Sequence, residues 1–174
     1  MDTGDVALLI STLSLVIAGA SLGWQVAQWL LSAGRARAVL MHGMLHGAGA
    51  FVGPVRKDGS GYHLKILHRQ GFEGIAVVGI QVTNHGRAPL FVEGVSLAPR
   101  GGVMRFVPMA ELHGPDLPHS LEAGTNASWY TSTDHAVTLA ASSRDVLREK
   151  VSSVYMTAQL GTGNTVETKR TLRV

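Results

Sequence analysis

A short segment near residue 41 gathers side chains that bind soft metal ions. The segment reads Met-His-Gly-Met-Leu-His and contains Met41, His42, Met44 and His46. Imidazole nitrogen together with thioether sulfur is a ligand set that suits copper. Residues 42, 44 and 46 share a face in a strand, and residues 42 and 46 also share one on a helix. The sequence therefore admits a copper- or other metal-handling role. The alternative is a first strand close to the membrane surface with half-exposed histidines and no metal.

Other catalytic and binding chemistries find little support in the sequence. The chain has no cysteine, which excludes disulfide scaffolds, thiolate zinc sites and iron–sulfur clusters. Ser132, Asp134 and His135 have the residue types of a hydrolase triad, but adjacency in the sequence is not triad geometry. The basic residues are spread thinly without an aromatic platform, so we expect no nucleic-acid partner. We expect a non-enzymatic protein without a cofactor.

The elements that must position these residues begin with an apolar N-terminal segment. Residues 6–34 carry no charge. A bilayer core of ~30 Å requires about 20 helical residues, so we expect a transmembrane helix over residues 6–31. Trp24 and Trp29 mark the end at which the helix leaves the lipid, because indole rings prefer the headgroup level. The acidic N-terminus is unlike the basic start of a signal peptide.

The charges that flank this segment predict its orientation. Asp2 and Asp5 precede it, whereas Arg35 and Arg37 follow it. Basic flanks stay in the cytoplasm. We therefore expect residues 1–5 outside the cell, a basic juxtamembrane hinge over residues 32–37 and a domain of residues 38–174 in the cytoplasm. The predicted location is the cell membrane, crossed once.

Gly19 and Gly23 form a Gly-x-x-x-Gly pair within the predicted span. Two small residues one turn apart let another helix approach closely, which favours contact between two copies of the helix. Glycine is also frequent in membrane helices that make no such contact. The pair therefore leaves self-association open.

The remainder of the chain has the pattern of a mainly β protein. Residues 76–82, 90–97 and 153–160 show strand-like apolar patterns, and residues 161–164 predict a hairpin loop before a returning strand over residues 166–174. A short helix is expected near residues 143–150, capped by Ser142 or Ser143. The glycine-rich residues 48–61 predict a flexible loop or hairpin tip. About seven strands without βαβ spacing favour an antiparallel sandwich.

Two segments carry a resemblance to a known class of modules. Residues 82–92 read Val-Thr-Asn-His-Gly-Arg-Ala-Pro-Leu-Phe-Val, and residues 117–129 begin Leu-Pro-His-Ser-Leu-Glu-Ala-Gly. These turn motifs resemble those of bacterial immunoglobulin-like β-sandwich domains. The whole layout is similar to small uncharacterised single-pass membrane proteins of high-GC Gram-positive bacteria. The resemblance implies an immunoglobulin-like sandwich and transfers no catalytic residue.

These observations together predict a membrane-anchored interaction module that tethers a protein partner, or its own oligomer, at the inner face of the cell membrane. Its expected partners are the lipid bilayer and a protein or a second copy. Residues 165–174 and 109–120 are the expected partner surfaces. A first alternative is a ligand-sensing effector whose transmembrane helix oligomerises, which requires a concave pocket in the β domain. The metal-handling role is the second alternative.

Overall fold

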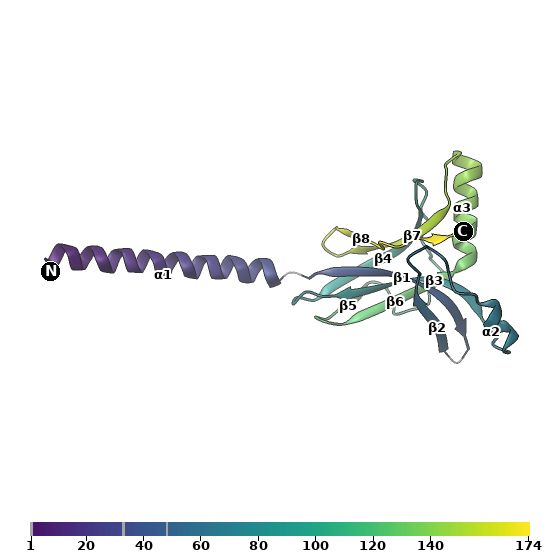
Figure 1. Ribbon diagram of the computed structural model, residues 1–174, viewed down its shortest axis with the longest axis horizontal. Coiled ribbons are helices and arrows are strands. Elements are labelled where there is room, and N and C mark those ends of the chain that lie inside the picture. Colours follow the sequence, from purple (N-terminus) through teal and green to yellow (C-terminus); the bar gives the residue numbers. More distant parts are fainter. Residues whose placement is uncertain (1, 33, 48) are drawn as a thin grey trace.

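A long helix stands apart from the rest of the chain. The computed structural model describes residues 2–32, 34–47 and 49–174, with the backbone alone over residues 29–32. Helix α1 spans Thr3–Ser32 and extends away from the β domain (Figure 1). Its stretch Thr3–Gln28 is apolar and long enough to cross a membrane, and none of that stretch is buried within the protein. Ser11, Thr12 and Ser14 donate their hydroxyl hydrogens to carbonyl oxygens of the preceding turn, so their polarity is satisfied inside the helix.

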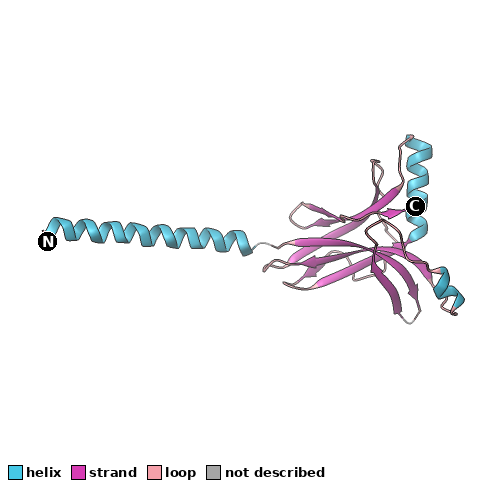
Figure 2. Ribbon diagram, viewed as in Figure 1, coloured by secondary structure: helices cyan, strands magenta, loops and turns pink. Residues whose placement is uncertain are grey.

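Two antiparallel sheets form the rest of the protein and pack together as a sandwich (Figure 2). The first sheet has the order β2-β1-β3-β6, with β1 at Ala36–His46, β2 at Gly49–Pro54, β3 at Ile75–Asn84 and β6 at Asn126–Ser132. The second has the order β5-β4-β7-β8, with β9 also paired to β7. Its strands are β4 at Leu90–Pro99, β5 at His119–Leu121, β7 at Ser153–Leu160, β8 at Thr165–Glu167 and β9 at Leu172–Arg173.

The strands are held by a core of alternating apolar residues. Trp129 on β6 is fully buried, and its indole N–H donates to the carbonyl oxygen of Pro115 at 2.8 Å. Aliphatic side chains of β1, β3, β4 and β7 surround it between the sheets, among them Leu40, Ile80, Leu97 and Met156. The mainly β sandwich after an apolar helix is therefore confirmed. Three strands shorter than four residues raise the number above the predicted seven.

The helix predicted near residues 143–150 begins earlier than expected. Helix α3 spans Thr133–Leu147, and its N-cap is Ser132, whose hydroxyl oxygen accepts the Asp134 N–H at 3.2 Å. Ser143 is a buried residue inside the helix rather than its cap. The helix joins β6 of one sheet to β7 of the other and packs against both, with Ala136, Leu139, Ala140 and Ser143 buried.

Residues 48–61 are only partly a loop, because six of them form strand β2. The strand pairs with β1 over the register Met41↔Pro54 to His46↔Gly49. A second helix, α2 at Lys65–Arg69, follows the loop and was not expected. Together β2, the loop and α2 lie at the end of the sandwich away from α1 (Figure 1).

Candidate functional site

The junction between anchor and sandwich is fixed by one buried amide. Asn84 is fully buried and its side chain makes four hydrogen bonds. Its Nδ2 donates to the carbonyl oxygens of Ala88 and Leu121, at 2.8 and 3.0 Å. Its Oδ1 accepts the N–H of Gly86 at 2.9 Å and that of Arg35 at 3.3 Å. The Asn-x-Gly turn, recognised in the sequence as turn chemistry, thus also attaches the chain that leaves α1.

The residues predicted as a basic hinge, 32–37, overlap the ends of both neighbouring elements, α1 and β1. The carbonyl oxygen of Arg35 accepts the N–H of His85 at 2.8 Å, so Arg35 already pairs with the sandwich. Arg37 is the second residue of β1 and is exposed. Helix α1 and strand β1 are therefore separated by residues 33–35, of which residue 33 lies outside the described part.

Both tryptophans predicted at the membrane interface belong to α1. Trp24 is exposed, as a membrane-interface residue would be before lipid surrounds it. The side chain of Trp29 lies outside the described residues. A Cβ added at Gly19 or Gly23 would meet no atom within 4 Å, so this face is open to a second helix or to lipid.

The predicted metal ligands do not converge. Met44 is fully buried, and Met41 points to the other face of β1 from His42, Met44 and His46. The Nδ1 atom of His42 accepts the N–H of Tyr62 at 3.0 Å, and the Nδ1 atom of His46 contacts the carbonyl oxygen of Glu73. Each ring thus commits one nitrogen to the main chain. Among the described residues, no group of three or more His, Cys, Asp or Glu side chains is placed to hold a metal ion.

His42 is instead a covered part of the β1–β2 hairpin. It is 6% exposed, it stacks on the Tyr62 ring with 6.2 Å between ring centroids, and a Cβ at Gly61 would lie 2.8 Å from its Cε1. Burial lowers the pKa of His42 below its ordinary value. The neutral ring with an unprotonated Nδ1 is the form that accepts the Tyr62 N–H.

A threonine, a histidine and a glutamate meet beside α3, but in a structural arrangement. Thr131 Oγ1 lies 2.8 Å from His135 Nδ1, and His135 Nε2 lies 3.6 Å from Glu111 Oε2. The Thr131 hydroxyl belongs to a fully buried residue, so a substrate has no path to it. Ser132, the serine of the sequence pattern, uses its hydroxyl oxygen to cap α3. These contacts fasten the start of the helix to β6.

An apolar pocket of about 510 Å³ lies between β2 and α2. We call it the β2–α2 pocket. Phe51, Tyr62, Leu64, Ile66 and Leu67 supply its apolar wall, with Arg56 and His63 at its border. Phe51 and Ile66 are exposed, so the pocket opens within an apolar surface. Its volume lies in the range of small-molecule sites, which is about 300–1,000 Å³.

A larger, more polar hollow of about 740 Å³ lies close to the root of α1. We call it the β1–β8 groove. One wall is the first half of β1, residues 36–40, with Pro54 at the end of β2. The other wall is the C-terminal segment, from which Val166, Glu167, Lys169 and Arg170 line the groove. Arg37 and Lys169 are exposed, so two cationic side chains border it.

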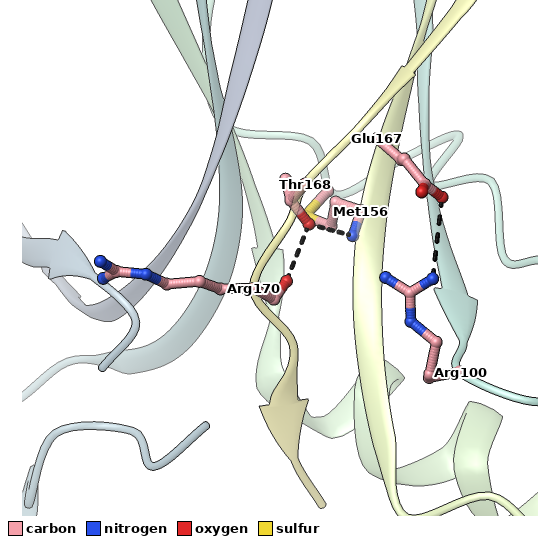
Figure 3. Close-up of polar contacts among 5 residues, drawn as sticks. All are labelled: Arg100, Met156, Glu167, Thr168 and Arg170. Atoms are coloured by element: carbon pink, nitrogen blue, oxygen red, sulfur yellow. Dashed lines mark hydrogen bonds and ion pairs between the residues drawn. The ribbon is translucent and has the colours of Figure 1, made fainter. Parts of the chain in front are cut away.

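The wall on the C-terminal side is shaped by Thr168 (Figure 3). Its hydroxyl accepts the Met156 N–H at 3.2 Å and donates to the Arg170 carbonyl oxygen at 3.2 Å, which bends the chain between β8 and β9. Arg170 points from this bend across the sandwich, and its Nη1 donates to the Val55 carbonyl oxygen. Glu167 points to the opposite side, where its Oε2 lies 3.9 Å from Arg100 Nη1.

The two predicted partner surfaces differ in exposure. In residues 165–174, Thr165 and Glu167 are exposed while Thr168 and Leu172 are buried. The Arg173 N–H donates to the Gly59 carbonyl oxygen at 2.9 Å, so the end of this segment is covered by the loop after β2. In residues 109–120, Met109 is 95% exposed.

Comparison with known proteins adds no functional assignment. The chain matches no protein-family model, and no curated protein matches it. Sequence reasoning had no signal for the groove, because its walls come from segments more than a hundred residues apart. The pocket did have one: residues 62–67 contain three aliphatic residues spaced as on one side of a helix turn, after a glycine-rich loop.

Proposed function

We propose that this protein is a single-pass, membrane-anchored interaction module whose sandwich holds a protein partner at the membrane surface. The observation that carries the proposal is that no residue of the apolar stretch Thr3–Gln28 is buried, while the sandwich beside it closes its own core. An exposed apolar surface of this extent is stable in lipid and not in water.

The module is proposed to act without catalysis. Its buried polar side chains in the described part hold the fold together: Asn84 ties the junction, Thr168 bends the C-terminal segment and His42 accepts a main-chain N–H. A rigid sandwich fixed directly to the membrane helix raises the local concentration of whatever it binds. The short connection through Arg35 supports this, because it limits how far the sandwich moves from the bilayer.

The orientation we propose places the N-terminus outside and the sandwich in the cytoplasm. Asp2 and Asp5 lie at the N-terminal end of α1, and Arg35 and Arg37 follow its C-terminal end. Because the chain has no cysteine, single cysteines report the side of the membrane without a background. We expect a membrane-impermeant maleimide to label D2C in intact cells and to label N164C only after permeabilisation. The reverse pattern would overturn the orientation, and loss of both from the membrane fraction would overturn the anchor.

The partner that the module holds could be a second copy of the chain, bound through the face of α1 that carries Gly19 and Gly23 (the glycine face). The variant G19L/G23L places two large side chains on that face. The control S14L/A18L places two leucines with the same spacing on the opposite face. We expect crosslinked dimers of the full chain to disappear only in G19L/G23L. Dimers that persist in both variants would remove the glycine face from the function, and a heterologous partner would remain.

A ligand-sensing role is the second candidate, favoured by the β2–α2 pocket. The apolar wall with Arg56 at its border suits a small apolar carboxylate. Dodecanoate is a suitable probe. Binding should raise the Tm of the full chain in detergent, and L67W, which fills the pocket, should abolish the increase. An unchanged Tm at millimolar dodecanoate would reject this candidate.

A further inference from the structure

The first half of β1 is a sheet edge that lacks a neighbouring strand. Strand β2 pairs with β1 only from Met41 to His46 and leaves the sheet after Pro54, whereas β3 pairs with β1 from Ala36 onward. The Leu40 carbonyl oxygen still accepts the Val55 N–H, so the outer side of residues 36–39 is the part without a strand. This vacant position continues the line of β2 toward the C-terminal end of α1.

The hydrogen bonds on either side of β1 show which main-chain groups face the vacant position. The Leu40 carbonyl oxygen accepts the Val55 N–H at 2.9 Å on the outer side, and the Arg35 carbonyl oxygen accepts the His85 N–H on the β3 side. Residues of a strand alternate between its two edges. Ala36 and Ala38 therefore turn their N–H and C=O groups outward, and no main-chain partner for them is found there within the described residues.

Strand β8 presents a second edge to the same groove. The Thr168 N–H donates to the Met156 carbonyl oxygen at 2.9 Å, and the Leu160 N–H donates to the Asn164 carbonyl oxygen at 2.8 Å. Even-numbered residues of this segment therefore pair with β7. By the same alternation, Thr165 and Glu167 turn their main-chain groups away from β7, toward the groove side.

Unpaired main-chain groups at a partly covered edge favour a partner that supplies both donors and acceptors. Ala38 is only 7% exposed, so its outward N–H and C=O groups have restricted access to water. An extended peptide satisfies both kinds of group, as in the addition of a strand to a sheet edge. A phosphate headgroup satisfies donors alone, and the carbonyl oxygens along the same edge repel it. The edge chemistry thus favours a peptide over a lipid headgroup.

The charges at the groove select the kind of peptide. Arg37 and Lys169 are exposed at its border. The one carboxylate in the wall, that of Glu167, faces Arg100 on the other side of its strand. An incoming strand that carries carboxylates therefore meets uncompensated positive charge.

We propose that the β1–β8 groove is a strand-addition site for an extended, acidic segment of a partner protein. The segment pairs with the outer edge of Ala36–Val39, through the outward main-chain groups of Ala36 and Ala38, and its carboxylates face Arg37 and Lys169. This inference rests on the proposed function, for which it names the binding surface and the chemistry of the partner. The position of the groove beside the junction to α1 holds the bound segment close to the bilayer.

The test uses the full chain in nanodiscs of zwitterionic lipid and a fluorescein-labelled peptide, acetyl-Glu-Val-Glu-Val-Glu-Val-amide. We expect saturable binding by fluorescence anisotropy, weaker binding of the Lys-Val counterpart, and no binding when alternate amides of the acidic peptide are N-methylated. N-methylation removes donors without changing charge, so it separates strand pairing from simple electrostatic attraction.

Two variants of the protein locate the site. A38P removes an outward N–H and leaves the bonds to β3 intact, and R37E/K169E reverses the two border charges. Each should weaken peptide binding at least about tenfold, as loss of a main-chain hydrogen bond or a charge reversal does. The matched control R69E/R144E reverses two exposed arginines elsewhere and should bind as the wild type. Because R37E/K169E alters only exposed side chains, it keeps the test valid if A38P unfolds.

Other outcomes overturn the inference. Absence of binding up to about 1 mM peptide, or equal binding by wild type and R37E/K169E, removes the groove as the site. Displacement of the peptide by phosphatidylglycerol vesicles, with vesicle binding lost in R37E/K169E and retained in A38P, assigns the groove to a lipid headgroup instead. The proposed function is tested independently by the D2C and N164C labelling, and the result of that labelling does not depend on whether the peptide binds.

Discussion

The two halves of strand β1 both pair with β3 but differ in what lies on their other edge. The first half, Ala36–Leu40, is fixed at its start by Asn84 and has no neighbouring strand along the outer edge of residues 36–39. The second half, Met41–His46, has a strand on both sides and is covered by Tyr62 and Gly61. Side chains with metal-binding chemistry lie in the covered half, and main-chain groups without partners lie in the open half.

This contrast shows that a side chain with ligand chemistry is not necessarily free to bind a ligand in the folded protein. His42 and Met44 have the chemistry of ligands, but burial and a main-chain hydrogen bond already engage them. Ala36 and Ala38 have no side-chain chemistry, yet their main-chain groups are the ones left to bind a partner. The position of the proposed binding site in this sandwich is therefore determined by where a strand lacks a neighbouring strand.

The largest expected effect comes from Asn84, which holds the open half in place. N84A leaves two carbonyl oxygens and two N–H groups without their partner. Unsatisfied buried groups cost about 1–3 kcal/mol each, with partial relief from water, so we expect about 3–4 kcal/mol lower free energy of unfolding. Urea unfolding of the full chain in detergent measures it. The control N164A lies in an exposed turn and should change stability by less than about 0.5 kcal/mol. A loss below about 1 kcal/mol for N84A would contradict the role of this junction.

The next effect separates the two edges of the open half directly. Val39 pairs with Gln81 and turns its N–H toward β3, whereas the neighbouring Ala38 turns its N–H outward. Proline is tolerated in a strand only where the missing N–H faces away from the ladder. We expect V39P to lower the free energy of unfolding by about 3 kcal/mol and A38P by about 1 kcal/mol or less. Equal losses in the same urea experiment would show that the assigned edge is wrong.

The elements of the sandwich could be predicted where local pattern decides them. The alternation of Ala76, Val78, Ile80 and Val82 gave β3, and Gly161 to Asn164 gave the turn before β8. Local pattern also indicates the start of α3. Ser132 before Asp134 is a capping pattern, and helical spacing is shared by the buried residues Ala136, Leu139, Ala140 and Ser143.

The candidate site could not be predicted, because it depends on pairings between distant segments. That β2 ends at Pro54 is a local property, but that no other strand replaces it beside Ala38 is a property of the whole fold. The covering of His42 likewise comes from Gly61 and Tyr62, which are far from it in the sequence. Only the flanking charges of the groove, such as Arg37, were evident from the sequence.

A smaller effect is expected where the covered half is packed most closely. A Cβ at Gly43 would lie 2.0 Å from the Phe51 carbonyl oxygen and 2.6 Å from Val52 Cα, so G43A must push β2 away from β1. Overpacking of this kind costs about 2 kcal/mol. Gly49 in the same hairpin has no atom within 4 Å of such a Cβ, and G49A is the matched control. If the two variants have the same unfolding midpoint, the close approach of the two strands is not what requires glycine.

The smallest expected effect concerns protonation in the covered half. Burial lowers the pKa of His42, so between that value and the ordinary value near 6.5 the unfolded chain binds a proton that the folded chain does not. The free energy of unfolding then decreases as the pH falls below about 6.5, and the decrease ends at the lowered pKa. Protonation of Nδ1 also removes the acceptor for the Tyr62 N–H. In H42N the amide oxygen replaces Nδ1 as acceptor but does not titrate. We therefore expect the Tm of the wild type to fall more steeply than that of H42N between pH 7.5 and pH 5. Parallel curves would mean that His42 is reached by water and protons in the folded protein, and the covered half of β1 would then be as open as the first.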